Sequence, residues 1–277
     1  MKFIKMYLGD FIKNINKKYS NVEFSGLAFN SKQVKKNDIF FAIKGNVFDG
    51  NKYIFDAIKR GAKIIISNKN FKQHNKDIIF IKNKYPRKLL AQVSYKLLKK
   101  NPKNLVAVTG TNGKSSVADF FYQILNLNNK KSASIGTIGI KFNGKNKSIG
   151  NTTLDPINLR ETINNLLKKR VMNIILEASS HGLKQNRLDG LFFDIGIFTN
   201  LSHDHLDYHK NFQDYLNSKL YLFKNLIKKK GFIIADPTTS QFGILKKISR
   251  KKKLRLLTIY NKNSDLELVS HQYKNHQ

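Results

Sequence analysis

The residues with the clearest chemical potential follow an apolar run and precede a helical one: Gly110, Thr111, Asn112, Gly113, Lys114, Ser115 and Ser116. Glycines let backbone N–H groups approach phosphate oxygens, and the start of a helix adds the positive end of its dipole. Lys114 can reach the outer phosphates of a nucleotide, and the Ser115 hydroxyl can bind Mg²⁺. The strict P-loop spacing would place a glycine at position 108, where the chain has Val108. We predict a phosphate-binding loop, with a turn that merely joins strand to helix as the alternative.

A second set of polar residues lies at the ends of two predicted strands. Glu177 ends one strand, and the next strand runs into the polar stretch Asn200–His209, which contains His205. A carboxylate and an imidazole beside a phosphate loop can hold Mg²⁺ between phosphates. Mg²⁺ prefers oxygen ligands, however, so the residues alone leave a metal site and a group of ordinary histidines as equal alternatives.

Two other sets of reactive side chains have simpler interpretations. Ser179, Ser180 and His181 could suggest nucleophilic catalysis, but neighbours in sequence rarely form a triad and no Gly-x-Ser-x-Gly elbow surrounds them. We therefore exclude a hydrolase. Lys219 lies in the helical stretch 212–228, and in so lysine-rich a chain the residue type alone indicates a solvent-facing side chain.

The elements before the loop form one predicted α/β domain. Between about residues 24 and 100, β-type runs at 38–43, 62–66 and 77–81 alternate with helical runs at 52–60 and 87–100. Strands separated by helices are typical of an α/β domain. The polar, proline-containing break Asn101–Asn104 marks the boundary, so we predict domains at 1–101 and 102–277.

The second predicted domain positions the chemistry. Strand-like runs lie at 105–108, 173–177, 193–199, 232–235 and 254–260, with helical runs such as 114–125 between them. Repeated strand–helix units predict a mostly parallel sheet of the P-loop type. Ligands of such sheets bind beyond the carboxyl ends of the strands, and every motif above falls at such an end.

Composition restricts the class of protein. The 277 residues carry a formal charge of +33, but only seven of the 51 basic residues are arginine and lysine is spread over every segment. This spread favours a solvated surface over a nucleic-acid interface. The absence of cysteine excludes disulfides and thiolate metal sites. No apolar run is long enough for a membrane span or a signal peptide, so we expect a soluble cytoplasmic protein without membrane insertion.

In order and spacing, these motifs resemble the MurE-type Mur ligases, the UDP-N-acetylmuramoyl-tripeptide synthetases, from roughly residue 24 to 235. Gly110–Ser116 looks like their shortened phosphate loop for ATP, and Thr199–His209 is similar to their most recognisable signature. The resemblance implies that Lys114, Glu177, His205 and Lys219 are catalytic. It also implies that Mg²⁺ is bound by four residues: Ser115, Glu177, His205 and a carbamylated Lys219.

The resemblance extends to residues that bind the sugar-peptide substrate. Asn151, Thr152 and Thr153 are similar to one such segment. The run Glu177–Arg187 matches another, in which Ser179, Gln185 and Arg187 bind the substrate. An N-terminal UDP-binding domain is implied by Asn30–Lys32 and Gly45–Gly50, with Ser31 and Asn46 as contacts. Asn30 and Lys32 stand where the family commonly has Asp and Arg.

The implied activity is an ATP-dependent ligation in peptidoglycan biosynthesis. The enzyme would join meso-diaminopimelate or L-lysine to UDP-MurNAc-L-Ala-D-Glu through an acyl phosphate. Mur ligases continue through the rest of the central domain and a third, amino-acid-binding domain. We therefore expect a truncated form, a split ligase with a separately encoded C-terminal half, or a decayed gene. The alternatives are a non-catalytic UDP-sugar or nucleotide-binding remnant and, less favoured, a basic nucleic-acid-binding P-loop protein.

Overall fold

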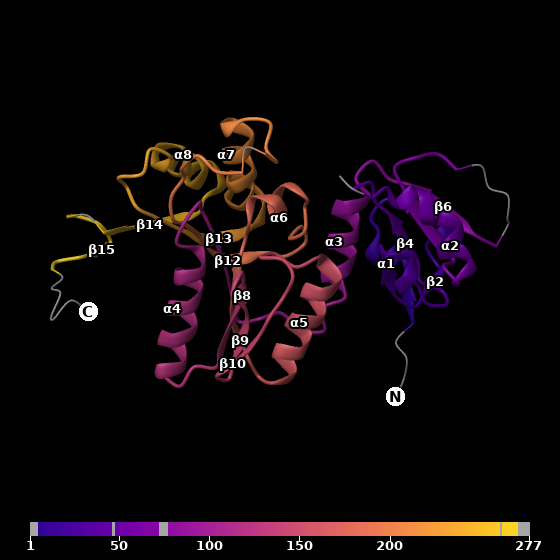
Figure 1. The fold of residues 1–277 in the computed structure, drawn as a ribbon, viewed down its shortest axis with the longest axis horizontal. Helices are drawn as coiled ribbons and strands as arrows, with labels where there is room; N and C mark the ends of the chain where they lie inside the picture. The colour runs from indigo at the N-terminus through magenta and orange to yellow at the C-terminus, as the bar shows by residue number, and fades with distance from the viewer. Residues whose placement is uncertain (1–4, 46–47, 72–76, 206, 261, 271–277) are drawn as a thin grey trace. The chain divides into compact units, whose positions relative to one another are not determined.

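The computed structural model describes residues 5–45, 48–71, 77–205, 207–260 and 262–270. The chain divides into two compact units (Figure 1). The first contains the chain up to Leu98 together with Pro156–Glu161, and the second contains Lys99–Asp155 and the chain from Thr162. Among the described residues, no helix is both long and apolar enough to cross a membrane.

The first unit is built on a parallel four-stranded sheet. Its strands, in spatial order, are β3 (Leu27–Ala28), β4 (Ile39–Ala42), β5 (Ile64–Ser67) and β6 (Ile79–Lys82). A short antiparallel pair consists of β1 (Met6–Tyr7) and β2 (Glu23–Phe24). The helices are α1 (Leu8–Phe11), α2 (Ile54–Lys59) and α3 (Pro86–Lys96), with 3₁₀ turns at Lys17–Tyr19, Ser31–Gln33 and Gly50–Tyr53.

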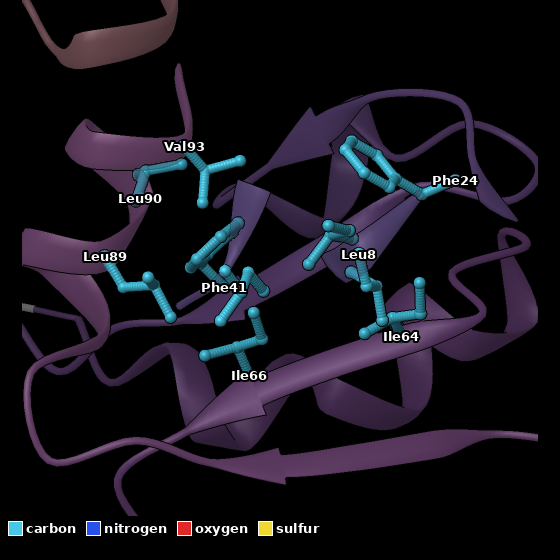
Figure 2. Packing of buried hydrophobic residues seen from close by; sticks show 10 residues of the cluster. Leu8, Phe24, Phe41, Ile64, Ile66, Leu89, Leu90 and Val93 are labelled. Atoms are coloured by element: carbon cyan, nitrogen blue, oxygen red, sulfur yellow. The ribbon is translucent and has the colours of Figure 1, made fainter. Parts of the chain in front are cut away.

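Both faces of this sheet are covered. Successive residues of a strand point to opposite faces, so Ile39 and Phe41 of β4 face one side while Phe40 and Ala42 face the other. Leu89, Leu90 and Val93 of α3 pack with the first pair (Figure 2). Ile54 and Ala57 of α2 pack with the second pair. The continuous apolar runs seen in the sequence are therefore strands buried on two sides.

The second unit contains a nine-stranded sheet in the order β10-β9-β8-β11-β7-β12-β13-β14-β15. β9 pairs antiparallel with both β8 and β10, and the remaining neighbours are parallel. The strands are β7 (Asn104–Thr109), β8 (Ser132–Gly136), β9 (Gly139–Phe142), β10 (Lys145–Lys147), β11 (Asn173–Glu177), β12 (Phe193–Phe198), β13 (Ile227–Ala235), β14 (Arg255–Tyr260) and β15 (Leu266–Glu267).

Helices follow most of these strands, as in other doubly wound sheets. They are α4 (Lys114–Leu127), α5 (Pro156–Lys168), α6 (Ser180–Lys184), α7 (Phe212–Tyr221) and α8 (Phe242–Lys252). The prediction of an α/β fold with a mostly parallel sheet is confirmed. The predicted phosphate loop, Glu177 and Thr199 lie at the carboxyl ends of β7, β11 and β12, which are adjacent in the sheet.

One predicted helical stretch extends two residues too far and changes its helix type before it ends. The helical stretch 212–228 ends as α7 at Tyr221, a π turn covers Leu222–Leu226, and β13 begins at Ile227. Apolar residues continue at helical spacing through this region, which explains the error. Pairing with β12 makes residues 227 and 228 part of a strand. Ile227 lies opposite Phe193, and Lys228 Nζ donates to Asp194 Oδ1 at 2.7 Å.

Candidate active site

The predicted phosphate loop, Gly110–Ser116, has a backbone that requires glycine. Gly110 and Gly113 have φ angles of 154° and 81°, which side-chain-bearing residues rarely adopt. A Cβ atom at Gly110 would lie 1.8 Å from Thr199 Oγ1 and 3.0 Å from the Asn200 backbone nitrogen. The glycine therefore permits a close approach between the loop and the end of β12.

The end of β12 holds the loop through direct hydrogen bonds. The Thr111 N–H donates to the Asn200 carbonyl at 3.0 Å, and the Asn112 N–H donates to the Asn200 side-chain oxygen at 2.9 Å. The Thr199 hydroxyl donates to the Asn112 carbonyl at 2.6 Å. The sequence predicted no contact of Thr199 or Asn200 with the loop. They reach the loop because β12, which precedes them, is the neighbour of β7 in the sheet.

Two lysines converge on one carbonyl oxygen of the loop. Lys114 Nζ donates to the Gly110 and Thr111 carbonyls at 3.0 and 2.7 Å. Lys219 Nζ donates to the same Gly110 oxygen at 2.6 Å and lies 4.3 Å from the centre of the Tyr215 ring. The residue-type expectation that Lys219 faces solvent is wrong, because its side chain is 1% exposed.

Burial changes the proton affinity of both lysines. Desolvation, followed by the charge of Lys114, lowers the pKa of Lys219 to about 7. Desolvation also lowers the pKa of Lys114, while Glu177 and Asp204 oppose that shift. Asp204 favours the charged form of Lys219 as well, but does not offset its burial. The loop thus holds two amines in a poorly hydrated space.

Among the predicted metal ligands, Glu177 is the one fixed by the largest number of hydrogen bonds. Its carboxylate is 2% exposed and accepts hydrogen bonds from Ser115 Oγ at 3.0 Å, Thr137 N at 2.9 Å and Thr137 Oγ1 at 3.1 Å. A Cβ at Gly136 would lie 2.0 Å from Glu177 Oε1, so glycine there leaves space for the carboxylate. The sequence interpretation missed Thr137, and its position directly after β8 was the available signal.

His205 is positioned differently from Glu177. Its backbone φ is 53°, its side chain is 45% exposed, and Nε2 lies 3.5 Å from Asp204 Oδ2. The ring packs edge-on against His181 with centroids 5.0 Å apart. Within the described part of the chain, no three or more His, Cys, Asp or Glu side chains form a group that could hold a metal. The structure thus joins Ser115 to Glu177 and Lys219 to the loop, and leaves His205 apart.

The predicted substrate residues of this unit form a network that reaches Glu177. Thr153 Oγ1 lies 3.0 Å from Ser179 Oγ and donates to the Glu177 carbonyl at 2.8 Å. Thr152 Oγ1 lies 2.9 Å from the Thr137 hydroxyl. The Arg187 guanidinium donates to the Gln185 side-chain oxygen at 3.0 and 2.8 Å and to the Thr153 carbonyl at 2.5 Å. Asn151 is exposed.

Ser179 and Ser180 have structural positions that agree with the exclusion of a hydrolase. Ser179 caps α6, where its hydroxyl accepts from the Gly182 N–H at 3.1 Å. The Ser180 hydroxyl is buried without a hydrogen-bond partner among the described residues. The His181 ring instead stacks on Tyr208 with centroids 3.9 Å apart. These three residues do not form a nucleophile–base pair.

Comparison with known proteins identifies the family. The family model described as Mur ligase middle domain matches residues 108–277, and the model described as Mur ligase family, catalytic domain, matches residues 23–98. The chain belongs to the Mur ligase family.

The similar relatives share one name. UDP-N-acetylmuramoyl-L-alanyl-D-glutamate–2,6-diaminopimelate ligase of Rickettsia typhi is 37% identical over 260 residues, which are 92% of this chain and 52% of the relative. The protein of the same name from Rickettsia bellii is 40% identical over 238 residues, 84% of this chain and 49% of the relative. The chain spans about half the length of the curated relatives it matches.

A solved structure supports the fold. A structure of UDP-N-acetylmuramoyl-L-alanyl-D-glutamate–2,6-diaminopimelate ligase superposes with a TM-score of 0.82 and 24% identity, covering 95% of this chain and 54% of that one. This similarity shows that both units of the present chain are arranged internally as in a Mur ligase.

The remaining predicted substrate residues lie in the first unit of this Mur ligase chain. Ser31 is buried, and its hydroxyl donates to the Asp56 carboxylate, which lowers the pKa of Asp56. Asn30 accepts from the Lys32 N–H at 3.0 Å, so its side chain caps the short 3₁₀ turn. Asn46 lies outside the described residues.

Proposed function

We propose that this chain provides the nucleotide-binding and UDP-sugar-dipeptide-binding half of an ATP-dependent amide ligase. The reaction is the addition of the third amino acid, meso-diaminopimelate or L-lysine, to UDP-MurNAc-L-Ala-D-Glu in peptidoglycan biosynthesis in the cytoplasm. One observation carries the proposal. A continuous hydrogen-bonded path runs from Ser115 through Glu177 and Thr137 to Thr152, and so joins the phosphate loop to the substrate residues. The names of the relatives support the substrates.

The loop residues would bind and align ATP. Helix α4 begins at Lys114 with Gly113 as its N-cap, so the backbone N–H groups of its first turn lie where the helix dipole favours phosphate oxygens. Lys114 bonds to loop carbonyls at 3.0 and 2.7 Å, and its flexible side chain would exchange these for phosphate oxygens. The D-glutamyl side-chain carboxylate then attacks the terminal phosphorus of ATP. The products are an acyl phosphate and ADP.

The second half of the reaction forms the amide. The amine of the incoming amino acid attacks the acyl carbon, inorganic phosphate leaves with the carbon–oxygen bond electrons, and the amine loses a proton. Ser179, Gln185 and Arg187 would hold the sugar-dipeptide in place through this step, the Arg187 fork being suited to a carboxylate or diphosphate. Their mutual hydrogen bonds, such as 2.8 Å from Arg187 to Gln185, fix them before substrate arrives.

The donor set around Glu177 fits Mg²⁺. The Ser115 hydroxyl and the Glu177 carboxylate provide two oxygen atoms 3.0 Å apart, and oxygen is the ligand type that Mg²⁺ prefers. The family resemblance assigns His205 to the same ion, although its contacts in the structure are with Asp204 and His181. When bound, Mg²⁺ neutralises the charge that develops on the transferred phosphoryl group.

Carbamylation of Lys219 is the second part of the proposal. A neutral amine adds to CO₂, forming an N–C bond and releasing one proton, and the product is an anionic oxygen ligand. The Lys219 side chain is buried beside Lys114, and its pKa of about 7 leaves part of it neutral near physiological pH. The carbamate would also replace repulsion between two ammonium groups by attraction.

The chain spans about half the length of the relatives it matches. We propose that a separately encoded C-terminal half completes the amino-acid pocket. Without that pocket the amine is not held near the acyl phosphate, and the advantage of proximity is lost. A non-catalytic remnant that binds UDP-sugar or nucleotide is the second candidate, favoured by the same observation.

The test is a turnover assay with mass detection of the tripeptide product. The purified chain is mixed with UDP-MurNAc-L-Ala-D-Glu, ATP, Mg²⁺ and either amino acid, with and without the C-terminal half of the Rickettsia typhi ligase. We expect substrate binding by the chain alone and tripeptide only after the second half is added. Robust tripeptide from the chain alone would contradict the split arrangement. Loss of substrate binding in every mixture would favour the remnant.

A further inference from the structure

The connections that lead into three adjacent strands of the large sheet meet at one edge. Asn173 of β11 lies opposite Asn104 of β7 on one side and opposite Ser132 of β8 on the other. Asn104 Nδ2 donates to Asn173 Oδ1 at 2.7 Å, and Asn173 Nδ2 donates to the Lys131 carbonyl at 3.0 Å. The residues that precede these strands therefore lie side by side at the amino edge of the sheet, about 4.8 Å apart from strand to strand.

This amino edge carries a group of basic side chains. The Lys99 N–H donates to the Asn164 side chain of α5 at 3.2 Å, and Lys169 Nζ lies 5.2 Å from the centre of the Phe142 ring of β9. Figure 1 shows the last turns of α4 and α5 close to β10 at this end of the second unit. The group, which we call the basic edge, consists of the exposed side chains of Lys99, Lys103, Lys130, Lys131, Lys169 and Arg170.

The basic edge has no acidic partners among the described residues. The connections 99–103, 128–131 and 169–172 contain no aspartate or glutamate, and no described carboxylate forms an ion pair with the basic edge. Asp194 of the neighbouring β12 accepts instead from Lys228 Nζ at 2.7 Å. The adjacent connections lie within a Debye length of one another, which is about 8 Å at physiological salt, so their positive potentials add.

The carboxyl edge of the same three strands has a different charge. The connections 110–113, 137–138 and 178–179, which follow β7, β8 and β11, contain no charged residue. A lysine content that is spread along the whole sequence would place basic residues at both edges. The fold therefore concentrates positive charge at the amino edge beyond what the composition alone predicts.

Helix dipoles explain only part of this concentration. A cation is stabilised in the last turn of a helix, but α4 has no basic residue in its last turn, and Lys103 directly precedes a strand. Arg170 has a φ angle of 61°, a left-handed conformation that glycine usually provides after a helix. An arginine at this position is less stable than glycine, so local stability does not account for it.

We propose that the basic edge docks the chain on an anionic phospholipid surface. Lysine side chains are long and flexible, so they attract a diffuse negative surface without requiring a fixed geometry. Leu127 at the end of α4 is 82% exposed and precedes Lys130 and Lys131 by one short turn. An apolar side chain among lysines can enter the headgroup region while the lysines remain at the phosphates.

Two other anionic partners match the basic edge less well. Single-stranded nucleic acid stacks its bases on exposed aromatic rings, whereas the Phe142 ring is half-buried beneath Lys169. An acidic protein would bury an apolar centre in its interface, and Leu127 by itself is too small to provide one. A lipid surface requires only the charges and a shallow apolar side chain.

Docking through the basic edge leaves the candidate active site free. The predicted phosphate loop and Glu177 lie at the carboxyl ends of the strands, which is the opposite edge of the sheet. Nucleotide and lipid can therefore bind at the same time. The inference goes beyond the proposed function and does not depend on it, so ATP affinity should be equal on anionic vesicles and in free solution.

Co-sedimentation with vesicles measures the docking. Wild type is tested on vesicles of phosphatidylglycerol mixed with phosphatidylcholine and on vesicles of phosphatidylcholine alone. The edge variant combines Lys130→Gln, Lys131→Gln, Lys169→Gln and Arg170→Gly. A matched control removes the same charge from exposed lysines of α8, as Lys246→Gln, Lys247→Gln, Lys251→Gln and Lys252→Gln.

We expect wild type and the control to bind the anionic vesicles, and the edge variant to bind about a hundredfold more weakly, since each basic residue near such a surface contributes several-fold. The Tm of the edge variant should equal or exceed that of wild type, because glycine suits the φ of 61° at position 170. Equal losses in both variants, or equal binding of wild type to uncharged vesicles, would overturn the inference. Edge-dependent binding to an oligodeoxynucleotide that is tighter than binding to the vesicles would also overturn it.

A fluorescent side chain tests the orientation of the docked chain. The sequence contains no tryptophan, so Leu127→Trp introduces a single reporter beside the basic edge. Its emission should shift to the blue on anionic vesicles and be quenched by brominated lipid. The control, Phe55→Trp, places the reporter at a site of the first unit that is 64% exposed, where the emission should not change. Equal responses of the two reporters would contradict docking through the basic edge.

Discussion

The two sides of the candidate metal site differ in how their side chains are held. On the β8–β11 side, Glu177 accepts three hydrogen bonds from Ser115 and Thr137. On the β12–α7 side, Lys219 shares the Gly110 oxygen with Lys114, and the His205 side chain is half-exposed. Nearby, the buried His209 ring makes no hydrogen bond at either nitrogen to any residue that the structure describes, and Asp214 Oδ2 lies 3.5 Å from its Nδ1.

This difference shows on which side of the site the arrangement of the side chains depends on a bound ligand. A carboxylate whose partners are already in place keeps its position without a metal, because each donor would otherwise be left unsatisfied. Two ammonium groups at one carbonyl repel each other and gain stability only when an anion is added. The Glu177 side is therefore preorganised, and under the proposed function phosphate, carbamate and Mg²⁺ would complete the Lys219 side.

The largest expected effect concerns the pH dependence contributed by Lys219. Its pKa of about 7 in the folded chain lies below its ordinary value of 10.5, so the unfolded state binds more protons between these values and stability rises with pH. Below about pH 7 the full cost of burying the ammonium remains. In Lys219→Met this rise disappears, and the difference from wild type changes by up to about 1.4 kcal/mol per pH unit.

The measurement is denaturant unfolding at pH 7 and pH 9 in CO₂-free buffer. Lys114, Asp204 and Tyr215 face Lys219 and are kept in both proteins. If the unfolding free energies of wild type and Lys219→Met change equally with pH, Lys219 is not desolvated in the folded chain. The two sides of the site would then not differ in their dependence on a ligand.

A smaller effect is expected from Glu177→Gln on the preorganised side. The neutral amide presents an N–H group to donors from Ser115 and Thr137, so the unfolding free energy should fall by about 2 kcal/mol. Any Mg²⁺ dependence of ATP binding should vanish as well. Chemical denaturation and calorimetric titration give the two readouts. A stable variant with normal Mg²⁺ dependence would place the metal elsewhere.

Substitution of Thr137 tests whether its hydroxyl helps to fix the Glu177 side of the site. Thr137→Val removes the hydroxyl that bonds Glu177 Oε2 at 3.1 Å and Thr152 at 2.9 Å, and should cost about 1 kcal/mol of stability. Thr137→Ser keeps the hydroxyl and should restore most of the loss. If both variants unfold alike, the Thr137 side chain contributes through packing and not through its hydrogen bonds.

The smallest effect on stability is expected for His205→Ala. The side chain is 45% exposed and its polar contact is Asp204 at 3.5 Å, so the unfolding free energy should change by less than about 0.5 kcal/mol. Mg²⁺-dependent ATP binding should nevertheless weaken. A large loss of stability would show that His205 is held as firmly as Glu177.

The sequence predicted the elements that local pattern determines. The strand 173–177 and the start of the helix at Lys114 agree with the structure, since apolar runs and the glycine loop leave few alternatives. The π turn after α7 could not be found, because Leu222–Leu226 has helical spacing and only pairing with β12 ends the helix. Thr137 was missed for the same reason, because its contact with Glu177 joins the ends of two different strands of the sheet.

The burial of Lys219 also required tertiary information. Lysine is abundant in every segment, so residue type indicated an exposed side chain, and only the family resemblance suggested a role. In the structure, α7 carries the side chain to the Gly110 carbonyl, 109 positions away in sequence. Contacts over such separations are set by sheet order and not by local pattern.

The most direct test of the account is calorimetric titration of the chain with ATP in the presence and absence of Mg²⁺. Wild type is compared with Lys114→Ala and with Lys246→Ala, a control at an exposed lysine of α8. We predict weak, Mg²⁺-dependent binding by wild type and by the control, and none by Lys114→Ala. Equal binding by wild type and Lys114→Ala would contradict the assignment of Gly110–Ser116 as the phosphate loop.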